Sequence, residues 1–416
     1  MTVYVFISSY PSGIGVNHGT VEYTPLRGGT GITTSELNYN QMLITSPLTF
    51  SKMTIHITTN TASVSFTMNF RVNQTTVTQT LVISAGITGV FTDTTHSDSA
   101  VAGNVANYQM LLGAGSGIVI YTATSVLANG TASVFQTTNQ GAGGFQVAGM
   151  FIPLGGQGLI ATSITTATEV RAQGVIRYPG IFKNMATSVA VSGSLGGTQT
   201  FVFRKNGVTG NQTITTSPST NGFFQDTTHT DPVVAGDKVC VECTATASGG
   251  APQIGVVQCE FSGGSDYLWS AQQGGINVGV LTGGTVYYDG FESPLTQPPT
   301  TESLVQLPMN LPSAFKDLWV YVFFNSCTLQ SSVTLRKNGV STAMSLPITA
   351  STSGLFEDSL DGPVTFNPAD LCNMQYTPGG TGNFQIIGLG IGIPLLYPGF
   401  MGSIVCIPTP KVNTLR

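Results

Sequence analysis

Histidine and carboxylate side chains gather in two segments of the sequence, and these residue types could carry chemistry. Segments 93–98 and 226–231 both read Asp-Thr-Thr-His, then Ser or Thr, then a second Asp. Carboxylate oxygens beside an imidazole could coordinate Ca²⁺ or Zn²⁺, or bind a sugar. The candidate metal ligands are Asp93, His96, Asp226 and His229. The alternative is an Asx turn, in which the Asp accepts backbone N–H bonds and the Thr hydroxyls complete the turn.

A third segment of the same kind favours the turn. It begins at Asp358 but continues Ser-Leu-Asp-Gly, so it keeps the first Asp and lacks the His. A turn held by the Asp tolerates this change, whereas a metal site would lose a ligand. We therefore interpret all three segments as structural turns, and we predict neither a metal ion nor another cofactor.

Other catalytic patterns are missing from the sequence. Cys240 and Cys243 have CxxC spacing, but a zinc site needs a second pair and a redox site needs a βαβ setting. The sequence contains no Gly-x-Ser-x-Gly, His-Glu-x-x-His or P-loop motif. A glycosidase with paired carboxylates stays open, because 19 acidic residues are present and their separation in space is unknown. We predict that the protein is not an enzyme.

The elements that position these turns repeat three times, with a period of about 132 residues. In every copy an Arg precedes the Asp of the turn by 22 residues, and a Pro-x-x-Phe motif lies further upstream. A period this long indicates three domains rather than a solenoid. The recurring residues are Phe50, Phe182 and Phe315, Arg71, Arg204 and Arg336, and Asp93, Asp226 and Asp358.

The pattern within each copy is one of strands and turns. Apolar and polar residues alternate from 64 to 72, which indicates a strand with one buried face. Asn-Gly at 206–207 and 338–339 predicts two-residue type I′ hairpins. Asn-Gln stands at 73–74, so we expect a turn of a different type or one residue longer there. About eight strands per copy, without a long amphipathic helix, predict an all-β protein of three tandem jelly-roll or β-sandwich domains.

Domain boundaries are expected where Gly pairs follow a closing strand. The third copy closes at 383–386, and a similar Phe-Gln-Val sequence at 144–147 suggests that the first copy closes there. The first copy would then carry an insertion at about 117–140. The predicted divisions are domains at 1–154, 155–263 and 264–394, and a C-terminal tail at 395–416.

The three arginines are expected on the outward face of their strands. They could bind an anion, or each Arg could form an ion pair with the Asp of its own copy, an interpretation that the constant spacing of 22 residues makes plausible. The alternative is a solvated strand end, where an exposed pair would contribute only about 0–1 kcal/mol.

Composition limits the partners and the surroundings. The net charge of −5 argues against nucleic acid, and the apolar segment 386–400 is too short and too broken by Gly and Pro to span a bilayer. The start of the chain lacks the features of a signal peptide. The six cysteines do not recur in all copies, so we expect buried free thiols in a protein assembled in a reducing cytoplasm. Only 8% of residues are charged, which predicts a surface of hydroxyls and amides.

Segment 203–237 resembles the jelly-roll modules of tailed-phage virion proteins. It carries Phe-Arg-Lys-Asn-Gly, Gly-Phe-Phe-Gln-Asp-Thr-Thr-His and Val-Ala-Gly-Asp. Such modules occur in head-decoration proteins, head fibres and tail-associated proteins. The likeness extends to all three copies, although the third lacks Thr-Thr-His and the first lacks the Gly after its Asn.

The resemblance implies a virion structural protein, assembled in the host cytoplasm, that decorates or cements the outer surface of a capsid. Its partners would be the major capsid protein or other virion proteins, without nucleic acid or membrane. The chain is expected to form a homo-oligomer, with a trimer as one form. The alternative is a fibre or adhesin module that binds a receptor or glycan through its loop ends.

Overall fold

The computed structural model shows an all-β protein. It describes residues 2–27, 32–36, 40–131, 133–139, 150–154, 156–158, 169–191, 198–217, 220–245, 253–263, 266–272, 280–291, 298–309, 311–358 and 362–394. Besides strands, these residues form two single-turn 3₁₀ helices, η1 (Glu169–Arg171) and η2 (Glu302–Leu304). In the part of the chain that the structure describes, no helix is long and apolar enough to cross a membrane.

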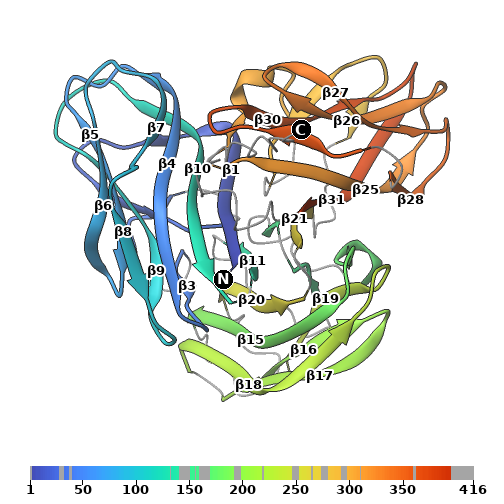
Figure 1. The fold of residues 1–416 in the computed structure, drawn as a ribbon, viewed down its shortest axis with the longest axis horizontal. Helices are drawn as coiled ribbons and strands as arrows, with labels where there is room; N and C mark the ends of the chain where they lie inside the picture. Colours follow the sequence, from blue (N-terminus) through green and yellow to red (C-terminus); the bar gives the residue numbers. More distant parts are fainter. Residues whose placement is uncertain are drawn as a thin grey trace, which may run out of the picture.

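The first copy of the repeat is a sandwich of two sheets (Figure 1). Its strands are β1 (Thr2–Val16), β2 (Val21–Thr24), β3 (Met42–Leu43), β4 (Leu48–Asn60), β5 (Phe66–Val72), β6 (Thr75–Ile83), β7 (Gly89–Thr92), β8 (Ser97–Ala100), β9 (Val105–Leu112) and β10 (Val119–Gly130). One sheet has the order β1-β10-β4-β7, with β8 also on β4. The other has the order β2-β9-β5-β6, with β3 also on β9.

The second copy repeats this arrangement. Its strands are β11 (Ser133–Asn139), β12 (Met150–Ile152), β13 (Gly156–Gly158), β14 (Gly174–Val175), β15 (Gly180–Val191), β16 (Gln199–Lys205), β17 (Val208–Thr216), β18 (Gly222–Val233), β19 (Lys238–Ala245) and β20 (Gln253–Ser262). The sheets are β11-β20-β15-β18, with β13 added beside β11, and β12-β19-β16-β17, with β14 also on β19.

The third copy is built in the same way. Its strands are β21 (Asp266–Gln272), β22 (Leu281–Thr282), β23 (Tyr287–Asp289), β24 (Leu307–Pro308), β25 (Ser313–Asn325), β26 (Ser331–Lys337), β27 (Val340–Ile348), β28 (Gly354–Glu357), β29 (Val364–Phe366), β30 (Leu371–Thr377) and β31 (Asn383–Pro394). The sheets are β21-β31-β25-β28, with β22 on β31 and β29 on β25, and β23-β30-β26-β27, with β24 on β30.

All three copies share the topology of a jelly roll. Each has eight strand positions in chain order, and the first, second and sixth of these can be split in two. One sheet contains positions 1-8-3-6 and the other 2-7-4-5. This is the double Greek key of a jelly roll, in which two antiparallel sheets enclose one core. The prediction of an all-β fold of three tandem sandwiches is confirmed.

Strand pairing corrects the predicted end of the first domain. β10 completes the first sandwich, whereas β11 pairs with β20 in the second, where Phe135 lies opposite Cys259. The first sandwich therefore ends with β10 at Gly130 and the second begins with β11 at Ser133, so the division does not lie at 154. There is no insertion at 117–140, because that stretch contains the closing strand of one sandwich and the opening strand of the next.

The three closing strands share their distance from the turn Asp and not a Phe-Gln sequence. Closing strands β10, β20 and β31 begin at 119, 253 and 383, which is 25 to 27 residues after the turn Asp of each copy. The closing strand predicted at 144–147 lies outside the described residues, as does the tail at 395–416.

The recurring phenylalanines form the centre of each core. Phe50, Phe182 and Phe315 are fully buried. Each packs on another aromatic ring from a different strand, and the centroids are 4.9 Å apart for Phe50–Phe70, 5.1 Å for Phe182–Phe203 and 4.9 Å for Phe315–Phe366. Full burial of such a side chain stabilises the fold by about 1.5–3 kcal/mol.

The turn at 73–74 has the same backbone conformation as its Asn-Gly counterparts. Asn73 and Gln74 have φ values of 49° and 62°, against 53° and 82° for Asn206 and Gly207. The expectation of a different or longer turn was therefore wrong. The side chain of Asn73 accounts for the shared turn conformation, because its Oδ1 accepts a 3.0 Å hydrogen bond from the backbone amide of Val105. Gln74 is held in a left-handed conformation that Gly would adopt without strain.

The three jelly rolls form a ring in Figure 1. The first lies on the left in blue and cyan, the second below in green and yellow, and the third at the upper right in orange and red. The sheets that contain β10, β20 and β31 lie on the inner side, while β6, β17 and β27 lie on the outer side. The contacts that close this ring involve the same strand positions in every copy.

Candidate protein interaction sites

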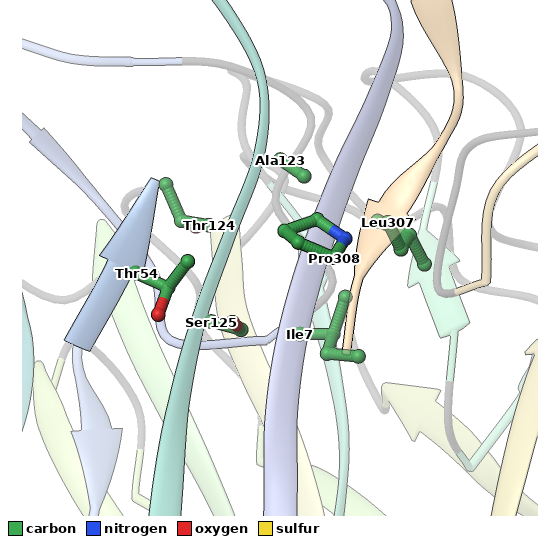
Figure 2. Close-up of a pocket in the computed structure, with 7 residues that line it drawn as sticks. All are labelled: Ile7, Thr54, Ala123, Thr124, Ser125, Leu307 and Pro308. Carbon is green, nitrogen blue, oxygen red and sulfur yellow. The ribbon is translucent and has the colours of Figure 1, made fainter. Parts of the chain in front are cut away.

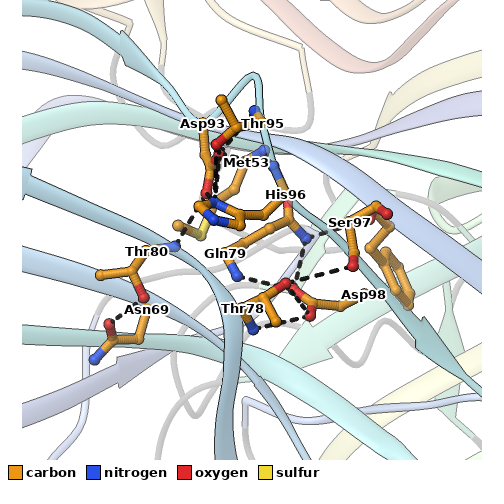
Figure 3. A network of polar contacts seen from close by, with 11 residues as sticks. Met53, Asn69, Thr78, Gln79, Thr80, Asp93, Thr95, His96, Ser97 and Asp98 are labelled. Carbon is orange, nitrogen blue, oxygen red and sulfur yellow. Dashed lines mark hydrogen bonds and ion pairs between the residues drawn. The ribbon is translucent and has the colours of Figure 1, made fainter.

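The first Asp of each Asp-Thr-Thr-His segment closes an Asx-type turn. Figure 3 shows this network in the first copy. Asp93 accepts backbone N–H bonds from Thr95 at 3.0 Å, His96 at 3.1 Å and Thr80 at 3.2 Å. In the second copy Asp226 accepts the equivalent bonds from Thr228, His229 and Thr213. These bonds fasten the turn to the neighbouring strands β6 and β17.

The histidines complete the turns from the outside. Nδ1 of His96 lies 2.9 Å from Oδ2 of Asp93, and His229 lies at the same distance from Asp226. Both imidazoles are more than half exposed, and no group of three or more His, Cys, Asp or Glu side chains suited to a metal occurs among the residues described. One Asp and one His supply fewer ligands than Zn²⁺ or Ca²⁺ requires. The geometry therefore supports a turn.

Hydrogen bonds lower the pKa of these carboxyl groups. Burial opposes ionisation of Asp93, but bonds from His96 and Thr95 outweigh it and lower the pKa of Asp93 to about 2. The pKa of Asp226 is also lowered, because bonds from Thr213, Thr228 and His229 outweigh its burial. Both groups are ionised acceptors in the folded protein.

The second Asp of each segment belongs to a buried network that sequence reasoning missed. Asp98 accepts the amide of Thr78 at 2.9 Å, and its other oxygen accepts the amide and side chain of Gln79 at 3.0 and 3.1 Å. Oε1 of Gln79 in turn accepts the amide of Met53 at 3.0 Å. The second copy repeats these bonds with Asp231, Asn211, Gln212 and Met185. The network joins three neighbouring strands.

In the third copy both partners of this network change together. Met344 stands where Gln79 and Gln212 stand in the other copies. Val364 lies opposite Phe315, as Asp98 and Asp231 lie opposite Phe50 and Phe182. Met344 is fully buried. Loss of only one partner would leave a buried polar group unpaired, which costs about 1–3 kcal/mol, whereas loss of both avoids that cost. This pattern is typical of structural residues.

The recurring arginines pair with glutamates and not with the turn Asp. Nε of Arg71 lies 2.7 Å from Oε1 of Glu36, and Nη2 lies 2.9 Å from Oε2. The matching pairs are Arg204–Glu169 and Arg336–Glu302. The predicted link from Arg to Asp93, Asp226 or Asp358 is therefore wrong. The sequence did contain the signal, because each Glu precedes its Arg by 34 or 35 residues.

Each guanidinium is occupied by further partners. It donates to a hydroxyl across the hairpin, to a carbonyl of the hairpin turn, and lies over an aromatic ring. The hydroxyls belong to Thr76, Thr209 and Ser341, the carbonyls to Gln74, Gly207 and Gly339, and the rings to Tyr23, Phe151 and Tyr288. With these partners the Arg holds the hairpin turn in place, and the arrangement does not favour an anion site.

The cysteines for which the structure gives side chains are buried free thiols. They are Cys240, Cys243, Cys259, Cys327 and Cys372. For these five the expectation of buried free thiols is confirmed, while Cys406 lies outside the described residues. Burial raises the pKa of the Cys243 thiol well above its usual value, which keeps the thiol protonated and unreactive.

A small pocket lies between the first and third sandwiches (Figure 2). It is lined by Ile7, Thr54, Ala123, Thr124, Ser125, Leu307 and Pro308. These side chains leave no room for a water molecule, and none of them is titratable in the physiological range. The pocket is therefore a packing seam, in which β24 of the third sandwich lies against β1, β4 and β10 of the first.

The contact from the first sandwich to the second is polar. The backbone of Leu43 exchanges two bonds with the side chain of Gln258, one of 3.2 Å to Oε1 and one of 2.7 Å from Nε2. The hydroxyls of Thr45 and Ser46 both donate to Glu260, which is 1% exposed. Because Glu260 is buried, these donors are needed to stabilise its carboxylate.

The contact from the second sandwich to the third uses an aromatic side chain. Tyr178 donates a 2.6 Å hydrogen bond from its hydroxyl to Asp317, and its ring lies under the ammonium of Lys316, 5.0 Å from the ring centre. Arg177 pairs with Glu357. A Cβ atom on Gly392 would overlap the Tyr178 hydroxyl, so any other residue there would force the Tyr178 side chain to shift.

The contact from the third sandwich back to the first closes the ring. The backbone carbonyl of Gln306 accepts a 3.2 Å bond from Nδ1 of His56. Ser9 donates a 2.7 Å bond to the carbonyl of Phe291. Burial lowers the pKa of His56, so the imidazole is neutral at pH 7. Leu307 and Pro308 add the apolar seam of Figure 2.

The three contacts come from equivalent places. β3, β14 and β24 begin at residues 42, 174 and 307, and each precedes or forms the segment that touches the next sandwich. The contacts run from the first sandwich to the second, from the second to the third, and from the third to the first. Head-to-tail contacts of this kind generate a closed ring when the rotation closes. The three contacts differ in their chemistry, so each one specifies which two sandwiches lie side by side.

No protein-family model matches the chain, and no curated protein matches its sequence. The features that bear on function are therefore the three jelly rolls, their arrangement and the resemblance of segment 203–237.

Proposed function

We propose that this chain is a non-enzymatic structural protein of a tailed-phage virion, which binds the outer surface of the shell as a decoration or cement protein. The observation that carries the proposal is the closed ring of three jelly rolls within one chain. Such a ring repeats each of its surfaces three times. This suits a contact of large area with an assembly whose own surface is also built from repeated subunits.

The polar clusters support a scaffold role. In all three copies the Arg of the repeat bonds to its Glu and to the hairpin turn. In the first two copies Asp93 and Asp226 fasten the turn to a neighbouring strand. The pocket of Figure 2 is filled by its own side chains. These repeated polar residues thus contribute to stability, which leaves the surface as the part that would meet a partner.

The ring also bears on oligomeric state. The sequence led us to expect a homo-oligomer, with a trimer as one form. Three jelly rolls that already contact each other head to tail occupy the position that the three subunits of a homotrimer would occupy. We therefore propose that one chain is the functional unit, and that its partners are the major capsid protein or other virion proteins.

Cryo-electron microscopy of intact virions tests the proposed function. A decoration protein should be present in hundreds of copies on the head, and the purified chain should bind empty shells that lack it. A few copies at the tail, together with retention on host surface glycans, would instead favour a receptor-binding fibre module. Absence of the chain from virions would overturn the proposal.

A further inference from the structure

One position of the repeat lies at all three contacts of the ring. It is the residue that precedes the proline of each Pro-x-x-Phe motif, and we call it the outgoing residue: Ser46, Tyr178 or Leu311. Each outgoing residue is half-buried. Ser46 bonds to the second sandwich and Tyr178 to the third. Leu311 packs on a hydrophobic cluster that contains core residues of both the third and the first sandwich.

On the other side of each contact, one position of the closing strand belongs to the next sandwich, and we call it the receiving residue. It is buried in every copy, and it pairs in register with the residue that directly follows the recurring Phe. The receiving residues are Leu127 on β10, Glu260 on β20 and Gly392 on β31, paired with Ser51, Lys183 and Lys316. The three positions are therefore equivalent, but one residue is aliphatic, one carries a carboxylate and one has no side chain.

At the first contact a hydroxyl meets a buried carboxylate. The hydroxyl of Ser46 donates a 2.5 Å bond to Oε1 of Glu260, and Asn184 donates a 2.9 Å bond to Oε2. Glu260 is 1% exposed, so its carboxylate oxygens need such donors from the protein. An aliphatic outgoing residue at this contact would remove one of them.

At the second contact an aromatic side chain occupies the space that a glycine leaves. A Cβ atom on Gly392 would overlap the Tyr178 hydroxyl. This hydroxyl donates to Asp317 at 2.6 Å, and Lys316 lies over the ring. Asp317 and Asn184 are equivalent, because each comes two residues after the recurring Phe and each has a positive φ. This position, which we call the supporting residue, serves a different pair at each of the two contacts.

At the third contact both residues are aliphatic. Leu127 is 4% exposed and belongs to the hydrophobic cluster on which Leu311 packs. Leu307 and Pro308 of the third sandwich line the seam of Figure 2 together with Ile7 of the first. This contact therefore joins the apolar cores of two sandwiches.

The three pairs do not tolerate exchange. A ring of three sandwiches can close in two directions, because each sandwich lies beside both of the others. In the reverse direction Leu311 would face Glu260, and the buried carboxylate would lose a donor. Tyr178 would face Leu127, whose side chain fills the space that Gly392 leaves open. Mismatches of this kind discriminate between partners in addition to the matched contacts.

The outgoing and receiving residues of a single sandwich do not match each other either. A ring of three first sandwiches from different chains would place the hydroxyl of Ser46 against the aliphatic Leu127. A ring of three second sandwiches would place Tyr178 against Glu260, where a carboxylate fills the space that the aromatic ring needs. The matched pairs form only when three different sandwiches meet.

We propose that these three pairs are the specificity-determining contacts of the ring. They select the direction in which the sandwiches close, and they prevent like sandwiches of different chains from assembling into a ring. Folds with internal symmetry need such elements, because their copies otherwise have more than one compatible arrangement. The pairs are Ser46 with Glu260, Tyr178 with Gly392, and Leu311 with Leu127. Their role does not depend on what the ring binds.

A transplant of one pair into another contact tests the proposal in the full chain. Ser46→Tyr with Glu260→Gly gives the first contact the pair of the second. The backbone amide of Leu43 donates to Gln258 across the first contact, so its hydrogen exchange reports whether that contact is closed. We expect each single change to accelerate exchange at Leu43 at least about tenfold, and the double variant to stay within about threefold of the unaltered chain.

The matched control separates recognition from the simple loss of a polar group. Ser46→Ala with Glu260→Gly removes the same hydroxyl and carboxylate but supplies no ring to fill the space. We expect exchange at Leu43 to remain at least about tenfold faster than in the unaltered chain. Equal exchange in this control and in the transplant would overturn the proposal, as would a transplant whose acceleration equals the product of the two single changes.

A second measurement exchanges two contacts without altering the composition of the chain. In one variant only the receiving residues are exchanged, by Glu260→Gly and Gly392→Glu. In the complete variant the outgoing and supporting residues are exchanged as well, by Ser46→Tyr, Tyr178→Ser, Asn184→Asp and Asp317→Asn. We expect the first variant to unfold at a lower urea concentration or to fail to fold, and the complete variant to recover at least about half of the loss. A complete variant no more stable than the first would overturn the proposal.

Discussion

Glu36 holds Arg71 through two parallel bonds, with Nε 2.7 Å from Oε1 and Nη2 2.9 Å from Oε2. The pair joins the segment before β3 to the end of β5, and its two side chains are only 12% and 10% exposed. The same pair recurs as Arg204–Glu169 and Arg336–Glu302. A two-point ion pair repeated in three copies fixes one geometry for the hairpin turn.

A double-mutant cycle measures this pair directly. We expect Arg71→Met and Glu36→Gln to show a coupling of about 1–3 kcal/mol in the free energy of unfolding, as for hydrogen bonds to charged groups that are largely buried. Urea unfolding followed by circular dichroism gives the values. The control cycle pairs Arg71→Met with Asp93→Asn, and we expect coupling below about 0.5 kcal/mol. A larger coupling in the control cycle would contradict the assignment of Glu36 as the partner.

The left-handed Gln in the first hairpin predicts a stabilising substitution. Gln74→Gly should raise the free energy of unfolding by about 1 kcal/mol, because Gly adopts a positive φ without the steric cost that a side chain incurs. The reciprocal change, Gly207→Gln, should lower it by a similar amount. Thermal unfolding of both variants provides the comparison, and a destabilising Gln74→Gly would show that the turn does not need this conformation.

The lowered pKa values of the turn carboxyls predict a specific loss of stability in acid. Asp93 has a pKa of about 2 in the folded protein, below the usual value of about 3.9 expected for the unfolded chain. A group whose pKa is depressed on folding stabilises the protein above its unfolded pKa, and this contribution disappears as the pH falls through the folded pKa. Stability should therefore decline between about pH 4 and pH 2.

The matched variant isolates these two groups. A chain with Asp93→Asn and Asp226→Asn should be less stable at pH 7 but should lose less stability between pH 4 and pH 2 than the unaltered chain. Calorimetric unfolding over this range tests it. Parallel pH profiles for the two chains would mean that other carboxyls dominate the acid response.

Gly392 predicts how tightly the second and third sandwiches fit. Gly392→Ala places a methyl group 2.4 Å from the Tyr178 hydroxyl, and we expect the overpacking to cost about 1–3 kcal/mol. Gly362→Ala is the control, since a Cβ there meets open space. Adding Tyr178→Phe to Gly392→Ala should restore part of the loss by removing the oxygen. A neutral Gly392→Ala in calorimetry would show that this contact does not form as described.

The sequence was sufficient for the architecture because strand patterns and turn residues recur locally. Phe50, Phe182 and Phe315 mark the same core position, and the Asn-Gly turns lie where the hairpins are. The boundary near 131–132 was missed because the opening strand of one jelly roll pairs with a closing strand about 120 residues later, and only the sheet reveals that pairing.

The partners of the polar residues were harder to predict. Spacing alone linked Arg71 to Asp93, yet residues at a fixed separation can lie on opposite sides of a sheet, and Asp93 bonds to Thr80 across the sandwich edge. The true partner, Glu36, precedes Arg71 by 35 residues, and the matching separations in the other copies are 35 and 34. The ring contacts, such as Tyr178 with Asp317, have no counterpart in the other copies, so no repeat in the sequence could identify them.

Cryo-electron microscopy of the intact virion tests the central claim most directly. The account predicts three-lobed density for each chain, in hundreds of copies, on the outer surface of the head. Virions that lack the chain, or that carry only a few copies away from the head, would contradict it.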